Sequence, residues 1–329
     1  MSRQPDRRAE IAAFLAGANW PDARRQPLAG DASARRYVRL CREEGSAVLM
    51  DAPPGSDAEI AAFLSIARHL RDRGLSAPEI LAADPARGLV LMEDFGDALF
   101  ARLAGQAPVL ETRLYAAAAD LLAALHRQPP PEGLPVHDAA CLGAQATLVL
   151  ESYAPAPEVA RRELAAAVTD ACRRLAPGGP VLELRDFHAG NLIWLPARAG
   201  IARVGLLDFQ DAMAGHPAYD LVSLLRDARR EVGPAAAAAA TDRYLAATGA
   251  DAQGLADACA ALGAARQLRI LGVFAGLARS RGKAGYLRHM PRVWRHLQGD
   301  LAHPGLAELR TVVAHWVPEP TPARLEALV

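Results

Sequence analysis

The first ninety residues combine short strand-like runs with amphipathic segments. Residues 35–40, 46–50 and 88–93 are short strand-like runs separated by Gly and Asp, as is typical of β-strands. Residues 6–17 read as an amphipathic helix. A second helix is predicted between the last two runs, because apolar side chains recur there at helical spacing before a stop at Gly74: Ile60, Phe63, Leu64, Ala67 and Leu70. This pattern predicts a small lobe of strands and helices.

After Gly96 the pattern becomes helical. Residues 109–127 and 157–175 are long Ala-rich segments, and everything from Tyr219 onward reads as helix. Between them, residues 181–208 resemble a β-hairpin. We therefore expect an α+β fold, with a small sheet-containing N-lobe over residues 1–93 and a mainly helical C-lobe over residues 94–329.

Composition limits the class of protein. The 329 residues are 51% hydrophobic, enough for about two packed lobes, and the formal net charge of zero gives no field that attracts nucleic acid or anionic lipid. The four cysteines are widely spaced and form no C-x-x-C pair, which favours free thiols in a reducing cytosol. The polar N-terminus and the absence of an apolar run of about 18 residues argue against secretion and membrane insertion. A cytoplasmic monomer is expected.

Two acidic turns carry the candidate chemistry. The first is L-R-D-F-H-A-G-N-L-I-W (184–194), and the second is G-L-L-D-F-Q-D-A (205–212). Phosphoryl transfer from ATP needs a carboxylate that orients the attacking hydroxyl, and hard oxygen ligands for Mg²⁺. Asp186 and Asn191 have the D-x-x-x-x-N spacing of the kinase template, and Asp208 follows behind an apolar strand. We predict that Asp186 is the catalytic base and that Asn191 and Asp208 bind Mg²⁺.

These residues also carry a family resemblance. D-F-H-A-G-N resembles the catalytic loop of the aminoglycoside phosphotransferase and choline kinase-like family, a branch of the protein-kinase-like fold. The segment from L-D-F-Q-D to D-L (207–221) looks like the second metal turn of that family. M-D-A-P-P (50–54) and L-M-E-D-F-G-D (91–97) are most similar to bacterial kinases that phosphorylate N-acetylmuramate and N-acetylglucosamine at the C1 hydroxyl in cell-wall recycling. The resemblance covers about residues 28–231.

The resemblance implies a bilobal protein-kinase-like fold and further roles. Asp220 would brace the catalytic loop from the following helix. His188 would support that loop or contact the substrate, and Asp211 would face the sugar or only cap a turn. The adenine-binding hinge would consist of four consecutive residues, Met92, Glu93, Asp94 and Phe95.

The chain departs from the family pattern at two places. Leu184 and Arg185 stand where the family has His-Gly, and Met50 stands where a lysine usually pairs with the ATP phosphates. The acidic residue that usually pairs with that lysine, here Glu59, would then have no lysine partner. The candidates that could bind the phosphates instead lie in one loop: Gly30, Ser33, Arg35 and Arg36.

The C-terminal helices bear on the acceptor. Residues 258–299 contain no Asp or Glu but eight basic residues, which suits an anionic acceptor such as a sugar with a lactyl carboxylate, or equally a solvated face or a contact to another partner. Arg266 and Arg269, one helical turn apart, could clamp that carboxylate. The predicted activity is ATP-dependent phosphorylation of a small amino sugar. Two alternatives are an aminoglycoside or choline-like kinase and a nucleotide-binding pseudokinase that regulates a partner.

Overall fold

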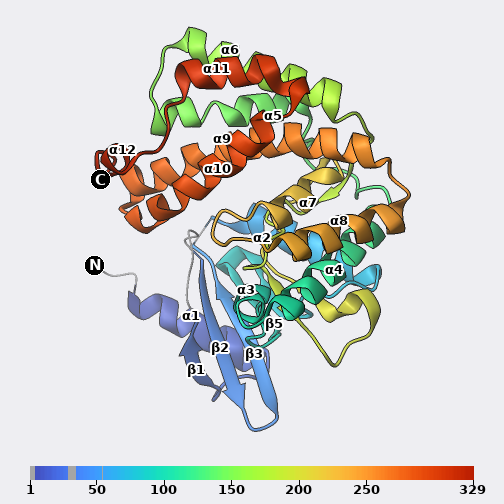
Figure 1. Cartoon of the computed structure of the whole chain (residues 1–329). Helices are drawn as coiled ribbons and strands as arrows, with labels where there is room; N and C mark the ends of the chain where they lie inside the picture. The colour runs from blue at the N-terminus through green and yellow to red at the C-terminus, as the bar shows by residue number, and fades with distance from the viewer. Residues whose placement is uncertain (1–3, 29–34, 54) are drawn as a thin grey trace. The chain divides into compact units, whose positions relative to one another are not determined.

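The computed structural model describes residues 4–28, 35–53 and 55–329, and the chain forms two compact units (Figure 1). One unit consists of Met1–Leu99 together with Asn191–Asp211, and the other consists of Phe100–Gly190 together with Ala212–Val329. The segment Asn191–Asp211 therefore belongs with the N-terminal residues, although it lies far along the chain. The sequence did not predict that this later segment would belong to the first unit. The lobe boundary expected after Glu93 stays a prediction.

The first unit is built on a five-stranded antiparallel sheet with the order β1-β2-β3-β5-β4. Its strands are β1 (Arg24–Pro27), β2 (Arg36–Arg42), β3 (Gly45–Asp51), β4 (Ile80–Asp84) and β5 (Leu89–Glu93). Its helices are α1 (Gln4–Gly17) and α2 (Asp57–Asp72). Helix α1 lies along the sheet in Figure 1. Leu15 of this helix shares one buried core with Leu40 and Leu49 of the sheet.

The strands and helices predicted for this region are confirmed, with two additions. Strands β1 and β4 were not predicted. All four residues of β1 are exposed, so the strand has no apolar pattern, and its place in the sheet comes from backbone pairing with β2.

The region of the two acidic turns contains two separate strand pairs. Strand β7 (Leu192–Trp194) pairs with β8 (Val204–Leu206) in the first unit. Strand β6 (Val181–Glu183) pairs with β9 (Met213–Gly215) in the second. The single hairpin expected over residues 181–208 is therefore wrong. Strands of three residues are too short for their pattern to specify which partner each one takes.

The second unit is a helical body. Its helices are α3 (Phe100–Ala104), α4 (Pro108–Leu125), α5 (Ala139–Ala146), α6 (Glu158–Leu175), α7 (Ala218–Leu225), α8 (Pro234–Thr248), α9 (Ala252–Arg281), α10 (Met290–Leu301), α11 (Ala307–Trp316) and α12 (Pro322–Glu326). In Figure 1, α5, α6 and α11 lie beside α9 and α10. The long helices predicted from residue 109 onward are confirmed.

Helix α9 is the centre of this body. Within the described part of the chain it alone is long and apolar enough to cross a bilayer. However, 83% of its apolar window is buried inside the protein, as expected for a core helix.

Candidate functional site

The backbone holds Asn191 and Asp208 next to each other within the first unit. Leu192 pairs with Leu206 in the β7–β8 ladder, and the N–H of Leu207 donates to the carbonyl of Asn191 over 3.0 Å. Asp208 follows at once, with a left-handed φ of +58° and an exposed side chain. Its neighbour Phe209 is buried and stacks on Phe63 of α2, with ring centroids 5.0 Å apart. The ladder and this stack fix the turn that presents Asp208.

These two side chains fit a magnesium ion chemically. Mg²⁺ prefers hard oxygen ligands and is usually held by one or two protein oxygens together with substrate phosphates and water. Asn191 offers an amide oxygen and Asp208 a carboxylate. The described residues contain no group of three or more His, Cys, Asp or Glu side chains that could hold a metal by themselves. A metal here would need the phosphates of a nucleotide as further ligands.

Gln210 orders the acidic turn. Its side-chain Nε2 donates to Asp208 Oδ1 over 3.0 Å and to Asp211 Oδ2 over 3.2 Å. Asp211 is exposed in this turn. Gln210 therefore holds both carboxylates in defined orientations.

Arg35 forms an ion pair with Glu59, the residue expected to lack a lysine partner. Its Nη2 lies 2.8 Å from Glu59 Oε2 on α2, and its side chain is only 9% exposed. Arg35 also forms a side-chain hydrogen bond with Tyr37, which pairs in register with Met50 of β3. Cross-strand partners lie on the same face of a sheet. Arg35 therefore lies close to the face that carries Met50, the residue that stands where a lysine was expected.

Tyr37 lies near Arg35 and near Asp208 of the acidic turn. Burial raises the pKa of the Tyr37 hydroxyl, and the charge of Asp208 raises it further while Arg35 lowers it. This mutual influence means that Arg35 and Asp208 both lie near Tyr37. A guanidinium and a carboxylate beside one tyrosine can together receive a phosphate group and its cation.

The structure gives less support for a phosphate-binding role of the other residues predicted for this loop. Gly30 and Ser33 lie outside the described residues. Arg36 is the first residue of β2, where it pairs in register with Asp51 and is exposed.

The predicted hinge consists of the last two residues of β5 and the two residues after it, and its polar side chains are already engaged. Met92 is 5% exposed, and the N–H of Glu93 donates to the carbonyl of Glu79. The Glu93 carboxylate is paired with Arg198, whose guanidinium also lies over the ring of Phe95 at 5.1 Å. Contact with an adenine at the hinge would therefore have to use backbone groups.

Asp94 has a structural environment. Its carboxylate accepts from Arg39 Nε over 2.7 Å and from the N–H of Gly96 over 2.9 Å. Burial works against the charged form, but these hydrogen bonds and the Arg39 charge hold the pKa of Asp94 below its usual value.

The catalytic loop lies in the second unit, between β6 and Gly190. Asp220 of α7, which is 1% exposed, accepts the N–H of Leu184 at 2.7 Å and the N–H of Arg185 at 2.8 Å. The bracing contact expected for Asp220 is therefore present. Burial, reinforced by the nearby Glu183 carboxyl, raises the pKa of Asp220 to about 8, while the two N–H groups favour its charged form. Asp186 follows this clamp with a half-buried side chain.

His188 supports the same loop. It is 7% exposed, its Nδ1 accepts the N–H of Gly190 at 3.1 Å, and its Nε2 lies 3.0 Å from Arg229 Nη1. Burial lowers the pKa of His188, so the protein environment favours the neutral imidazole. The guanidinium of Arg229 also lies 5.9 Å from the ring centre of Tyr286, which packs on Phe274. Arg229 and Tyr286 were not predicted, since nothing in their local sequence indicates that they approach the loop.

The basic residues of 258–299 do not form one uniform surface. Arg292 and Arg295 both pair with Glu231, at 3.2 and 2.7 Å. Arg266 is 5% exposed and donates to Ser223, whereas Arg269 is half-buried. Of the two arginines predicted to bind the acceptor, Arg269 has the more accessible side chain.

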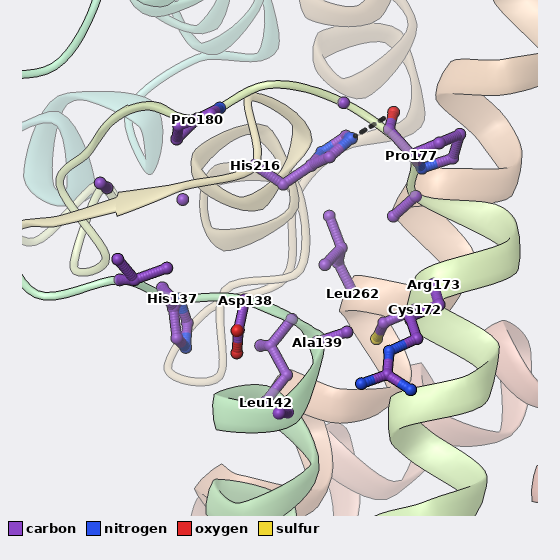
Figure 2. Close-up of a pocket in the computed structure, with 16 residues that line it drawn as sticks. His137, Asp138, Ala139, Leu142, Cys172, Arg173, Pro177, Pro180, His216 and Leu262 are labelled. Carbon is purple, nitrogen blue, oxygen red and sulfur yellow. Dashed lines mark hydrogen bonds between the residues drawn. The ribbon is translucent and has the colours of Figure 1, made fainter.

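A cavity of about 350 Å³ lies beside the β6–β9 ladder, where Pro180, Gly215 and His216 are among its lining residues (Figure 2). His216 borders it, with Nε2 3.4 Å from the carbonyl of Pro177, and His137 and Asp138 form another part of its wall. None of the described residues predicted for the site lines it. No residue of 184–190 lines this cavity.

The fold and the two acidic turns define a kinase-like phosphotransferase. The chain belongs to the phosphotransferase enzyme family, whose model matches residues 24–257. It is 40% identical to the N-acetylmuramate/N-acetylglucosamine kinase of Caulobacter vibrioides, over 98% of this chain and 99% of that protein. It is 32% identical to the kinase of the same name from Pseudomonas aeruginosa, over 89% of each chain. The predicted family is confirmed, and the protein is a kinase-type enzyme.

Solved structures agree on the fold. A choline/ethanolamine kinase family protein from Mesorhizobium loti has a TM-score of 0.65 at 17% identity, covering 96% of this chain and 100% of that one. The predicted fold class, a small sheet-containing N-terminal part followed by a mainly helical part, is confirmed.

Proposed function

We propose that this enzyme transfers the γ-phosphoryl group of ATP to the C1 hydroxyl of N-acetylmuramate and N-acetylglucosamine, giving the sugar 1-phosphate for peptidoglycan recycling. One observation carries the proposal: the 40% identity that extends over 98% of the chain to a kinase named for these two sugars. An identity spread over the full length includes the acceptor-binding half as well as the nucleotide-binding half. The enzyme would act as a cytoplasmic monomer, in keeping with its four free cysteines.

Asp186 would orient the sugar hydroxyl and accept its proton. This role is supported by its position directly after the Asp220 clamp, which fixes the backbone of the two preceding residues. The half-buried side chain of Asp186 leaves part of the carboxylate accessible to a substrate. A base held on a fixed backbone loses little freedom when the hydroxyl arrives.

Asn191 and Asp208 would hold Mg²⁺ together with the phosphates of ATP. When bound, the ion would neutralise phosphate charge and align the γ-phosphoryl group. Support comes from the ladder that keeps the two residues adjacent and from the chemistry of their oxygen atoms.

Arg35 would bind the phosphates in place of a lysine, with Glu59 orienting its guanidinium. The 2.8 Å ion pair and the low exposure of Arg35 support this role. Gly30, Ser33 and Arg36 would contribute to the same phosphate-covering loop. Backbone groups of Met92 to Phe95 would meet the adenine, and residues 1–93 would serve as the nucleotide-covering lobe.

The acceptor would bind in the remaining part of the chain, residues 94–329. Arg269 is the candidate for the lactyl carboxylate of N-acetylmuramate, because its side chain is more exposed than that of Arg266. Asp211 would face a sugar hydroxyl, and His188 would act by keeping the catalytic loop in place.

A panel of acceptors tests the proposal. Purified enzyme with ATP and Mg²⁺ is offered N-acetylmuramate, N-acetylglucosamine, glucose, kanamycin and choline, and ADP release is compared with a reaction without acceptor. We expect ADP release above that background with the two N-acetyl amino sugars only. Turnover of kanamycin or choline without turnover of the sugars would favour a small-amine kinase. ATP binding without turnover of any acceptor would favour a pseudokinase.

A further inference from the structure

Arg185, the residue before Asp186, has an unusual backbone conformation. Its φ is +67°, in the left-handed region that glycine adopts freely and that a residue with a Cβ adopts only at a cost in free energy. The conformation therefore needs contacts that hold it. Because Arg185 and Asp186 share a peptide bond, whatever holds Arg185 also sets the direction in which the Asp186 side chain leaves the backbone.

Both backbone polar groups of Arg185 are bonded to α7. Its N–H donates to Asp220 Oδ1 at 2.8 Å, and its carbonyl accepts from Ser223 Oγ at 3.1 Å. Asp220 and Ser223 are three residues apart, so they lie on the same face of the helix. Both are buried, at 1% and 0% exposure. The carbonyl of Arg185 belongs to the peptide that leads directly into Asp186.

Arg266 of α9 fixes the hydroxyl of Ser223. Its Nη2 donates to Ser223 Oγ at 2.8 Å, and the side chain is 5% exposed. A guanidinium can only donate, so Ser223 Oγ must accept from it and direct its own proton to the carbonyl of Arg185. The two hydrogen bonds therefore form one directed chain from α9 through α7 to the catalytic loop.

We propose that Arg266 and Ser223 are positioning residues for phosphoryl transfer, acting through the carbonyl of Arg185 on Asp186. The proposal rests on the proposed function, in which Asp186 is the base. It gives Arg266 a role different from the acceptor clamp expected from the sequence, since its side chain is buried and its Nη2 is bonded to Ser223. Neither residue would touch ATP or sugar, so their loss should change kcat and leave the Michaelis constants almost unchanged.

The test compares Ser223→Ala, Arg266→Met and the double variant with wild type. We expect each single variant to lose about 10- to 100-fold in kcat, the effect of a displacement of about 1 Å at a reacting group. The KM values for ATP and sugar should stay within about threefold. Because both residues act through one chain of hydrogen bonds, the double variant should lose little more than either single variant.

Matched controls separate positioning from general destabilisation. Ser280→Ala removes an exposed hydroxyl that bonds within its own helix, and Arg243→Met removes an exposed arginine paired with Asp120. Neither should change kcat. If Arg266→Met fails to fold, Ser223→Ala, which removes a single oxygen atom, carries the test.

Two results would overturn the positioning role of Arg266 and Ser223. The first is a kcat within threefold of wild type in the folded single variants. The second is a double variant whose loss in kcat is the product of the two single losses, with every loss in proportion to the fraction of protein that remains folded. Failure of the proposed function is distinct from both, because wild type itself would then phosphorylate no amino sugar.

Discussion

At the scale of single residues, strained backbone marks both acidic turns. Among the described residues, three that are not glycine have a positive φ in the left-handed region, and Arg185 and Asp208 are two of them. Each such residue costs on the order of 1–2 kcal/mol, although Asp tolerates the region better than most. Conformations of this kind persist where surrounding contacts hold them, and they concentrate at functional sites.

Arg35 gives the residue-scale prediction. Arg35→Met should reduce kcat/KM for ATP about 10- to 100-fold, roughly 1.4–2.7 kcal/mol, because a cation that faces the phosphates is lost. Glu59→Gln should have a smaller effect, since it only orients the guanidinium. Steady-state kinetics with varied ATP measures both. Arg25→Met, the same change at an exposed position of β1, is the control. A twofold effect or less for Arg35→Met would rule out the phosphate role.

The sequence was sufficient to nominate residues whose relation is local. Asp186, Asn191 and Asp208 stand within 23 residues and follow a known spacing. The Arg35–Glu59 pair joins positions 24 residues apart, and Ser223–Arg266 joins positions 43 apart. Such contacts depend on how strands and helices pack, which periodicity does not specify.

At the scale of elements, the packing of α10 on α9 depends on a buried carboxylate. Asp300 of α10 is 3% exposed and pairs with Arg226 at 2.6 Å. Gly263 of α9 allows this approach, because a Cβ there would lie 2.3 Å from Asp300 Oδ2. Burial raises the pKa of Asp300 to about 7, against the opposing influence of Arg226.

This pKa predicts how stability depends on pH. An unfolded Asp titrates near 3.9, so between about pH 4 and pH 7 the folded chain keeps a proton that the unfolded chain releases. The resulting stabilisation is complete below pH 4 and is lost as pH rises through 7. The free energy of unfolding of wild type relative to Asp300→Asn should therefore fall with pH, by at most about 1.4 kcal/mol per unit.

Urea denaturation of both proteins between pH 5 and pH 8 measures the difference. Asp170→Asn, which removes an exposed carboxylate paired with Arg174, should show no such slope relative to wild type. A flat or rising difference for Asp300→Asn would mean that Asp300 is charged throughout the range.

Elements differ in how well their patterns predict them. The long helices were predicted within a few residues because their apolar positions repeat over many turns. The three-residue strands β6 to β9 were found as a region but were paired incorrectly, because so few residues leave several pairings open.

At the scale of the whole molecule, the chain crosses between its two units around the candidate site. Asp186 belongs to one compact unit, and Asn191 and Asp208 belong to the segment that returns to the other. The changes of unit fall at Gly190–Asn191 and at Asp211–Ala212, directly beside the acidic turns. The residues proposed for the chemistry are thus divided between the two units along the chain, which the single boundary expected after Glu93 did not predict.

Phosphorus NMR tests the central claim most directly. Wild type and Asp186→Asn are each incubated with ATP, Mg²⁺ and N-acetylmuramate or N-acetylglucosamine. For wild type we predict loss of the γ-phosphate signal, formation of ADP, and one new phosphate ester signal coupled to the anomeric proton. Asp186→Asn should fold normally and form this ester at least about 1,000-fold more slowly. An ester at another hydroxyl, release of inorganic phosphate alone, or an Asp186→Asn rate within tenfold of wild type would contradict the account.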